Sequence, residues 1–106
     1  MSNLGNITDT EFHTFVAAGV TLVDFWAPWC QPCIQLTPRL EEAASVLGDR
    51  VRIVKMDVDA NPKVAEELGV MSVPALLLFK DGKRLARSGN LSSVAQILSM
   101  VETALA

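Results

Sequence analysis

The segment VTLVDFWA, residues 20–27, constrains the fold most because it is rich in β-branched and aromatic residues and is apolar on both faces. A strand of this kind is typical of the centre of a sheet that is covered on both sides. A helix is predicted just before it, beginning near ITDTEF, where Thr8 and Glu11 have capping-box spacing, and ending at Gly19. We therefore expect a central strand with helices packed around it.

A second predicted helix begins at the two cysteines and ends at Gly48. Pro38 lies within it and is expected to kink it, because proline cannot donate a hydrogen bond to the carbonyl group of Ile34. The predicted inner stripe recurs at helical intervals. It consists of Cys33, Leu36, Leu40, Ala43, Ala44 and Leu47.

The remaining elements continue the alternation of strands and helices. A strand is predicted at 51–58, followed by a helix with Asn61 as its cap, Pro62 at its first position and Gly69 at its end. Two strands follow at 75–80 and 83–88, joined by an Asp81–Gly82 turn. The last predicted helix has apolar residues at 94, 97, 98, 101 and 105. Ser92 or Ser93 is expected to cap the last helix, and a short strand is expected near residues 4–7.

This order predicts an α/β fold of three layers, with helices on both faces of one mixed sheet of four to five strands. Strands joined by helices should be parallel, and the hairpin should add antiparallel ones. The 106 residues are expected to form a single domain, residues 1–106, and half of them are hydrophobic, which is enough for a core.

Charge and composition exclude several classes of function. The net charge is −3 and the basic residues form no block, so nucleic acid is not expected as a partner. The longest apolar stretch is interrupted by Asp24 and is too short to span a bilayer. The polar N-terminus lacks the features of a signal segment, so we expect a cytoplasmic protein. In that compartment a cysteine pair is catalytic or metal-bound more often than structural.

The chain's two cysteines lie three positions apart in FWAPWCQPCIQL, residues 25–36. They could bind a metal, staple a loop or exchange electrons. A zinc site needs four ligands, and the remaining soft candidate, His13, is predicted on the outer face of the first helix, so no metal is expected. A staple that closes so short a loop would stabilise the fold little, and buried inert thiols remain a further alternative.

The redox interpretation follows from the position of the pair between a central strand and a helix. At the helix N-terminus, free N–H groups and the helix dipole would stabilise a Cys30 thiolate and lower its pKa. Cys33 lies one turn further on the same side, close enough for a disulfide. Cys30 could therefore attack a substrate disulfide, and Cys33 could resolve the mixed disulfide.

The sequence resembles the thioredoxin family over nearly its whole length. The resemblance is carried by VDFWAPWCQPC, Pro38, KMDVDANPKVAEELGV, SVPALLLFKDGK and the Gly89 turn. It implies the thioredoxin fold, with Cys30 as the attacking thiol and Cys33 as the resolving one, paired as a disulfide when oxidised. Trp29 would flank the nucleophile and Pro32 would shape the first turn. Gln31 departs from the glycine usual in the family and bears on the redox potential.

Asp24 is a candidate from the strand pattern itself. It shares a strand face with Leu22 and Trp26, so burial should raise its pKa. The resemblance implies that Asp24 lies beneath the disulfide and assists proton transfer, with Lys55 near it. The alternatives are a polar group tolerated on an exposed sheet face for Asp24, and a surface lysine for Lys55.

Val73 and Pro74 precede a predicted strand, and an ordinary strand start is the alternative interpretation. The resemblance implies a cis Val73–Pro74 bond opposite the cysteines, where the backbone of Val73 would pair with an extended substrate segment. The resemblance also places Gly89 on the surface where a substrate would dock. Met71 occupies a position where a basic or polar residue is frequent in the family.

The resemblance implies a protein-disulfide reductase without a bound cofactor, which receives electrons from NADPH through thioredoxin reductase. Its other partners would be oxidised protein substrates, and we expect a monomer. One alternative is a more oxidising oxidase or isomerase, which Gln31 would permit. The other is a thioredoxin-fold binding module with incidental cysteines.

Overall fold

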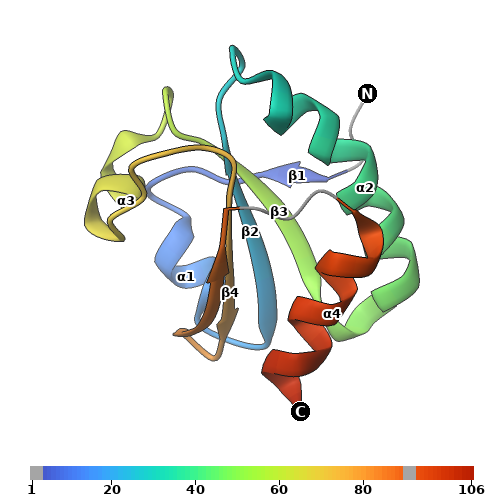
Figure 1. Ribbon diagram of the computed structural model, residues 1–106. Coiled ribbons are helices and arrows are strands. Elements are labelled where there is room, and N and C mark those ends of the chain that lie inside the picture. Colours follow the sequence, from blue (N-terminus) through green and yellow to red (C-terminus); the bar gives the residue numbers. More distant parts are fainter. Residues whose placement is uncertain (1–3, 90–92) are drawn as a thin grey trace.

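The computed structural model describes residues 4–89 and 93–106 of the chain (Figure 1). The described elements are β1 (Gly5–Asn6), α1 (Phe12–Val16), β2 (Val20–Trp26), α2 (Gln31–Leu47), a short 3₁₀ turn (Gly48–Arg50), β3 (Arg52–Asp57), α3 (Pro62–Glu67), β4 (Ala75–Lys80), β5 (Lys83–Ser88) and α4 (Val94–Leu105). The predicted order of elements is confirmed, including the short first strand.

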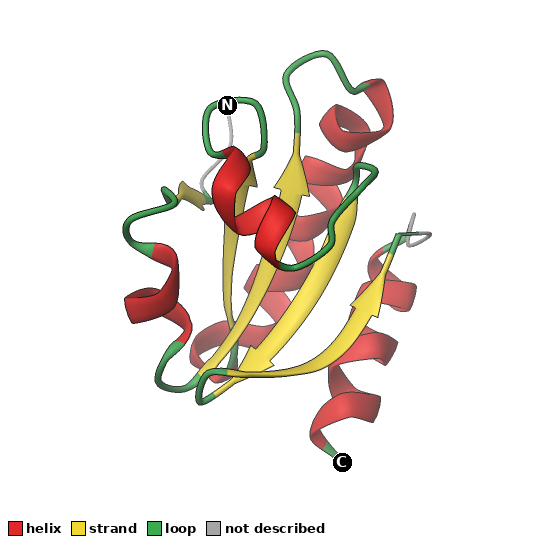
Figure 2. Ribbon diagram, turned by 90° about the vertical axis from the view of Figure 1, so that its left-hand side faces the viewer, coloured by secondary structure: helices red, strands yellow, loops and turns green. Residues whose placement is uncertain are grey.

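The five strands form one mixed sheet in the order β1-β3-β2-β4-β5. β2 is the central strand, parallel to β3 on one side and antiparallel to β4 on the other. Figure 1 shows α1 and α3 on one face of this sheet and α2 and α4 on the other, and Figure 2 shows the sheet face-on between them. The predicted three-layer α/β fold, with helices on both faces of a mixed sheet, is therefore confirmed.

One prediction about the sheet was wrong. Strands joined by helices were expected to be parallel, but β4 follows α3 and runs antiparallel to β2, and hence to β3. The reason is the length of α3, whose six residues span about 9 Å and cannot return the chain along a strand of about 20 Å. The chain therefore enters β4 at the same edge where it left β3, with Ala75 and Met56 both opposite Phe25.

Alternation along β2 sends successive side chains into two separate cores. Val23 and Phe25 pack with α1 and α3, whereas Leu22 packs with α2 and α4. The cluster under α2 and α4 consists of apolar side chains. It includes Leu36, Leu40, Ala43, Leu47, Leu76, Leu78, Ile97 and Val101. The face that carries Leu22 also carries Asp24, so this strand delivers a carboxyl group into an apolar layer.

The caps of the two short helices differ from prediction. α1 begins at Phe12 after a turn, and the Glu11 carboxylate accepts from both the backbone N–H and the hydroxyl of Thr8, so only half of the capping box forms. Asn61 precedes α3 as predicted, but its side chain accepts from Asp9 N–H instead. The Asp9 carboxylate caps α3, accepting from the N–H groups of residues 63 and 64 at 3.1 and 2.9 Å.

The two longer helices, α2 and α4, agree with the predictions from the sequence. Pro38 lies inside α2, and Figure 1 shows the helix changing direction in its first half. Ser93 caps α4 in a capping box with Gln96, which confirms one of the two candidates, while Ser92 lies outside the described residues. The Asp81–Gly82 turn is also as predicted, with φ of 50° and 86°, the left-handed values that a tight hairpin requires.

Candidate active site

Cys30 and Cys33 form a disulfide at the point where β2 leads into α2, with their Cα atoms 5.3 Å apart. Cys30 is the N-cap of the helix, and its sulfur accepts the backbone N–H of Cys33 at 3.2 Å. Cys30 is 4% exposed and Cys33 is fully buried. Of the two cysteines, Cys30 alone keeps any exposed surface.

The electrostatic setting of Cys30 favours a negative charge. α2 is 17 residues long and directs the positive end of its dipole toward Cys30, and its first turn contains no acidic residue. The amide of Cys33 already points at the Cys30 sulfur. These features stabilise a thiolate at Cys30 once the disulfide is reduced.

Two distant segments complete the surroundings of the disulfide. Val73 packs against the cluster formed by Ala27 and the two cysteines. The Val73–Pro74 bond is cis, as the resemblance implied. A methyl group at Gly89 would lie 3.6 Å from the carbonyl oxygen of Pro74, so the Gly89 turn abuts the proline segment. The fold thus brings residues 30–33, 73–74 and 89 together at one edge of the sheet.

The rim beside the disulfide is open to solvent. Trp29 is 68% exposed, and Gln31 and Pro32 are exposed on the first turn of α2. Trp29 Nε1 donates to Asp59 Oδ2 at 2.9 Å, which fixes the indole ring on the surface. Nothing in the sequence indicated Asp59, because it follows another strand and lies 30 residues away. Met71 is 94% exposed on the loop between α3 and Pro74.

Asp24 is completely buried, which excludes the alternative of a polar group on an exposed face. Neither of its carboxylate oxygens has a hydrogen-bond partner among the described residues. Desolvation raises the pKa of Asp24 from 3.8 to about 7, against a smaller opposing effect of the Lys55 charge. At neutral pH this carboxyl group can therefore both hold and release a proton.

Lys55 is 6% exposed and so is not a surface lysine. It is the register partner of Asp24 on the neighbouring strand. Its Nζ donates to Thr37 Oγ1 at 2.9 Å and lies 4.1 Å from the centre of the Trp26 ring. The sequence prediction missed Thr37, although its position four residues after Cys33 is one turn along the inner face of the helix.

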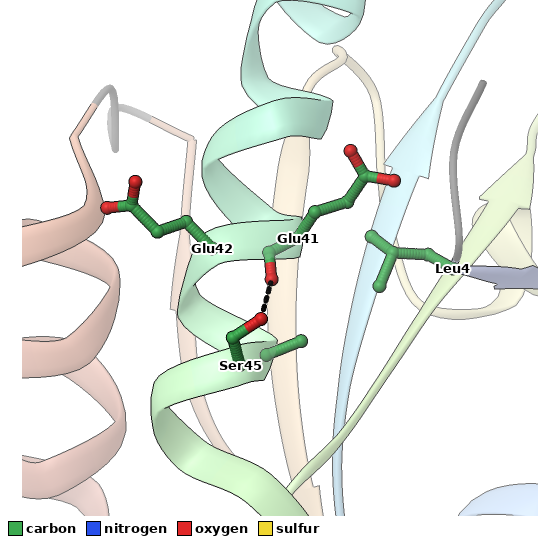
Figure 3. A pocket seen from close by; sticks show the side chains of 5 residues that line it. Leu4, Glu41, Glu42 and Ser45 are labelled. Carbon is green, nitrogen blue, oxygen red and sulfur yellow. Dashed lines mark hydrogen bonds between the residues drawn. The ribbon is translucent and has the colours of Figure 1, made fainter.

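A separate hollow lies on α2 away from the disulfide and is lined by Leu4, Glu41, Glu42, Ala44 and Ser45 (Figure 3). Glu41 and Glu42 point to opposite sides of the helix in this view, so their carboxylates do not converge. Ser45 donates to the Glu41 carbonyl oxygen at 3.3 Å. The first helical residue of this hollow, Glu41, is eleven residues after Cys30, about 16 Å along the helix, so the hollow is not part of the disulfide site.

Within residues 4–89 and 93–106, no three histidine, cysteine, aspartate or glutamate residues gather as they would around a metal ion. His13 lies on the surface, where it contacts Glu67 at 3.1 Å. No helix in the described part of the chain combines the length and apolar content needed to cross a bilayer.

The three-layer fold, with a Cys-x-x-Cys disulfide capping the helix that follows a central strand, defines the class of dithiol–disulfide exchange proteins. The family described as Thioredoxin matches the chain over residues 3–103. The chain therefore belongs to the thioredoxin family.

Individual thioredoxins match over most of their length. The thioredoxin of Bacillus subtilis is 51% identical over 76 residues, which cover 72% of this chain and 73% of the relative. That of Chlamydia muridarum is 44% identical over 95 residues, or 90% of this chain and 92% of the relative. A Staphylococcus aureus thioredoxin is 49% identical over 77 residues, or 73% and 74%. Together with the cysteine pair, these matches identify a thiol–disulfide oxidoreductase that acts as a protein-disulfide reductase.

Proposed function

We propose that Cys30 is the attacking thiol and Cys33 the resolving thiol in the reduction of protein disulfides. The Cys30 thiolate attacks one sulfur of the substrate disulfide, forms a mixed disulfide and releases the first substrate thiolate. Cys33 then loses its proton and attacks the Cys30 sulfur, which releases the second substrate thiolate. The enzyme dithiol is oxidised to the Cys30–Cys33 disulfide and the substrate gains two electrons. The observation that carries this assignment is that Cys30, at the helix N-terminus, keeps 4% exposure, whereas Cys33, one turn behind it, is fully buried.

Asp24 is the group that accepts the proton from Cys33 in the resolving step and returns it in the reverse direction. A carboxyl group with a pKa of about 7 is half ionised at neutral pH, which suits a group that must both accept and donate a proton. Lys55 is the charged neighbour that limits how far burial raises this pKa. Asp24 lies on the sheet face that α2 covers, the helix that carries Cys33.

The substrate docks over the disulfide, on a surface formed by Trp29, Gln31, Pro32, the Val73–Pro74 segment and Gly89. The backbone of Val73 pairs with an extended segment of the substrate. The absence of a side chain at Gly89 keeps the space beside the Pro74 carbonyl open. Gln31 projects from the exposed first turn of α2, where it can contact the substrate directly.

Electrons reach the chain from NADPH through thioredoxin reductase, which renews the Cys30–Cys33 dithiol, and no cofactor is bound. The cytoplasm is the expected compartment, because a reductase must be kept reduced. Residues 1–106 act as a single domain and a monomer, which fits a site built from three segments of one sheet edge.

The test is insulin reduction with purified thioredoxin reductase and NADPH, which reports both the chemistry and the donor. The chain should turn over, Cys30→Ser and Cys33→Ser should lose activity, and Ser99→Ala, at an exposed position of α4, should retain it. A parallel assay with dithiothreitol as the electron donor tests the exchange chemistry without thioredoxin reductase. Activity only with dithiothreitol would contradict the proposed donor, and activity retained by Cys30→Ser would contradict the proposed nucleophile.

A further inference from the structure

The buried ammonium group of Lys55 has a neutral hydroxyl as its hydrogen-bond partner and not a carboxylate. Its Nζ donates to the Thr37 hydroxyl at 2.9 Å and lies over the Trp26 ring. Its register partner on the adjacent strand is Asp24, whose two buried oxygens have no hydrogen-bond partner among the described residues. An ammonium–carboxylate hydrogen bond is stronger than one to a neutral hydroxyl. Something must therefore hold the ammonium group away from the carboxylate.

Thr37 is equipped to do this because of its place on α2. Its hydroxyl lies one turn after Cys33 and donates to the Cys33 carbonyl oxygen at 3.3 Å. A hydroxyl has one proton and two lone pairs, so with the proton directed at Cys33 a lone pair is left for Lys55. The hydroxyl thus links the ammonium group of β3 to the turn of helix that carries the resolving cysteine.

We propose that Thr37 is a positioning residue for the exchange reaction: its hydroxyl anchors the Lys55 ammonium on α2 and keeps it out of a direct ion pair with Asp24. The inference rests on the proposed role of Asp24. Without the anchor, the buried ammonium group would turn to the oxygens of its register partner Asp24, which are buried and have no hydrogen-bond partner among the described residues.

The surroundings of Asp24 leave Lys55 as the charge through which Thr37 can act. Lys55 of β3 is the register partner of Asp24, and Cys33 of α2 does not titrate while it is in the disulfide. The buried side chains that β4 and α4 contribute there are apolar, namely Leu76, Leu78, Ile97 and Val101. The raised pKa of Asp24 agrees with a carboxyl group that is desolvated and not directly ion-paired.

The experiment is a titration of the Asp24 carboxyl carbon by ¹³C NMR in the oxidised protein, where the cysteines are paired. Thr37→Val removes the hydroxyl at nearly constant volume, and Thr37→Ser is the matched control that keeps it. We expect the pKa of Asp24 to fall by about one unit or more in Thr37→Val, as for a carboxylate that gains an adjacent cation, and to stay near the wild-type value in Thr37→Ser. An unchanged or higher pKa in Thr37→Val overturns the proposal. If Thr37→Val does not fold, Thr37→Ala replaces it.

A second pair of variants tests whether the effect passes through Lys55. In a Lys55→Gln background, Thr37→Val should no longer lower the pKa of Asp24, and a fall that persists there overturns the anchoring mechanism. The pH profile of the resolving step then separates this inference from the proposed function. Should the pKa fall while the profile stays fixed, the anchor is supported and the proton-transfer role of Asp24 is contradicted.

Discussion

Replacing Asp24 with asparagine should change how stability depends on pH. In the folded oxidised protein the pKa of Asp24 is about 7, and its ordinary value is 3.8. Between these values the folded state holds a proton that the unfolded state has lost, so the wild-type free energy of unfolding falls as pH rises through this window. Each pH unit is worth about 1.4 kcal/mol, so three units correspond to a loss of about 4 kcal/mol by pH 8. Asp24→Asn lacks this term and should gain about that much relative to wild type between pH 4 and pH 8.

Urea unfolding of both oxidised proteins, followed by far-UV circular dichroism at several pH values, measures the difference. The asparagine amide imposes its own cost of burial, about 1–3 kcal/mol, but that cost does not vary with pH. Val23→Ala, on the same strand and without a titratable group, is the control and should differ from wild type by a constant amount. If the Asp24→Asn difference were also constant to within about 1 kcal/mol, desolvation would not be what governs this carboxyl group.

Two further outcomes are expected. In the reduced protein, iodoacetamide at mildly acidic pH should label Cys30 before Cys33, as read by mass spectrometry of the digest, and the reverse order would contradict the assigned roles. Asp9→Ala should lower the free energy of unfolding by about 1 kcal/mol, because it removes the cap of α3, while the exposed Lys63→Ala should change it less. Equal losses in these two variants would show that the cap contributes little.

Local patterns in the sequence were sufficient for most of the fold. β4 and β5 were predicted with their observed bounds, since an Asp-Gly turn between two strand-like runs specifies a hairpin by itself. The direction of β4 was not predictable in this way, because it depends on the end of the sheet at which the chain lies after α3. The cap of α3 was missed for a similar reason, since Asp9 lies 54 and 55 residues before the two amides that it binds.

The same distinction holds for the candidate site. The cysteine pair and its position at a helix N-terminus could be predicted, because spacing within one turn fixes both. The burial of Asp24 followed from alternation along a central strand. The partner of Lys55 could not be predicted, since its long side chain can reach both Asp24 and Thr37 and the choice depends on the packing of α2 against the sheet. Asp59 was missed because its bond to Trp29 joins two loops.

β4 runs the length of the sheet, so its two ends lie at opposite ends of the molecule. This strand begins at Ala75, next to the disulfide end of β2, and runs to the Asp81–Gly82 hairpin at the far end (Figure 1). A foreign peptide inserted into that hairpin would project from the end of the molecule opposite the disulfide. The hairpin is therefore a position where a label or binding sequence can be added without covering the end of the molecule that carries Cys30 and Cys33.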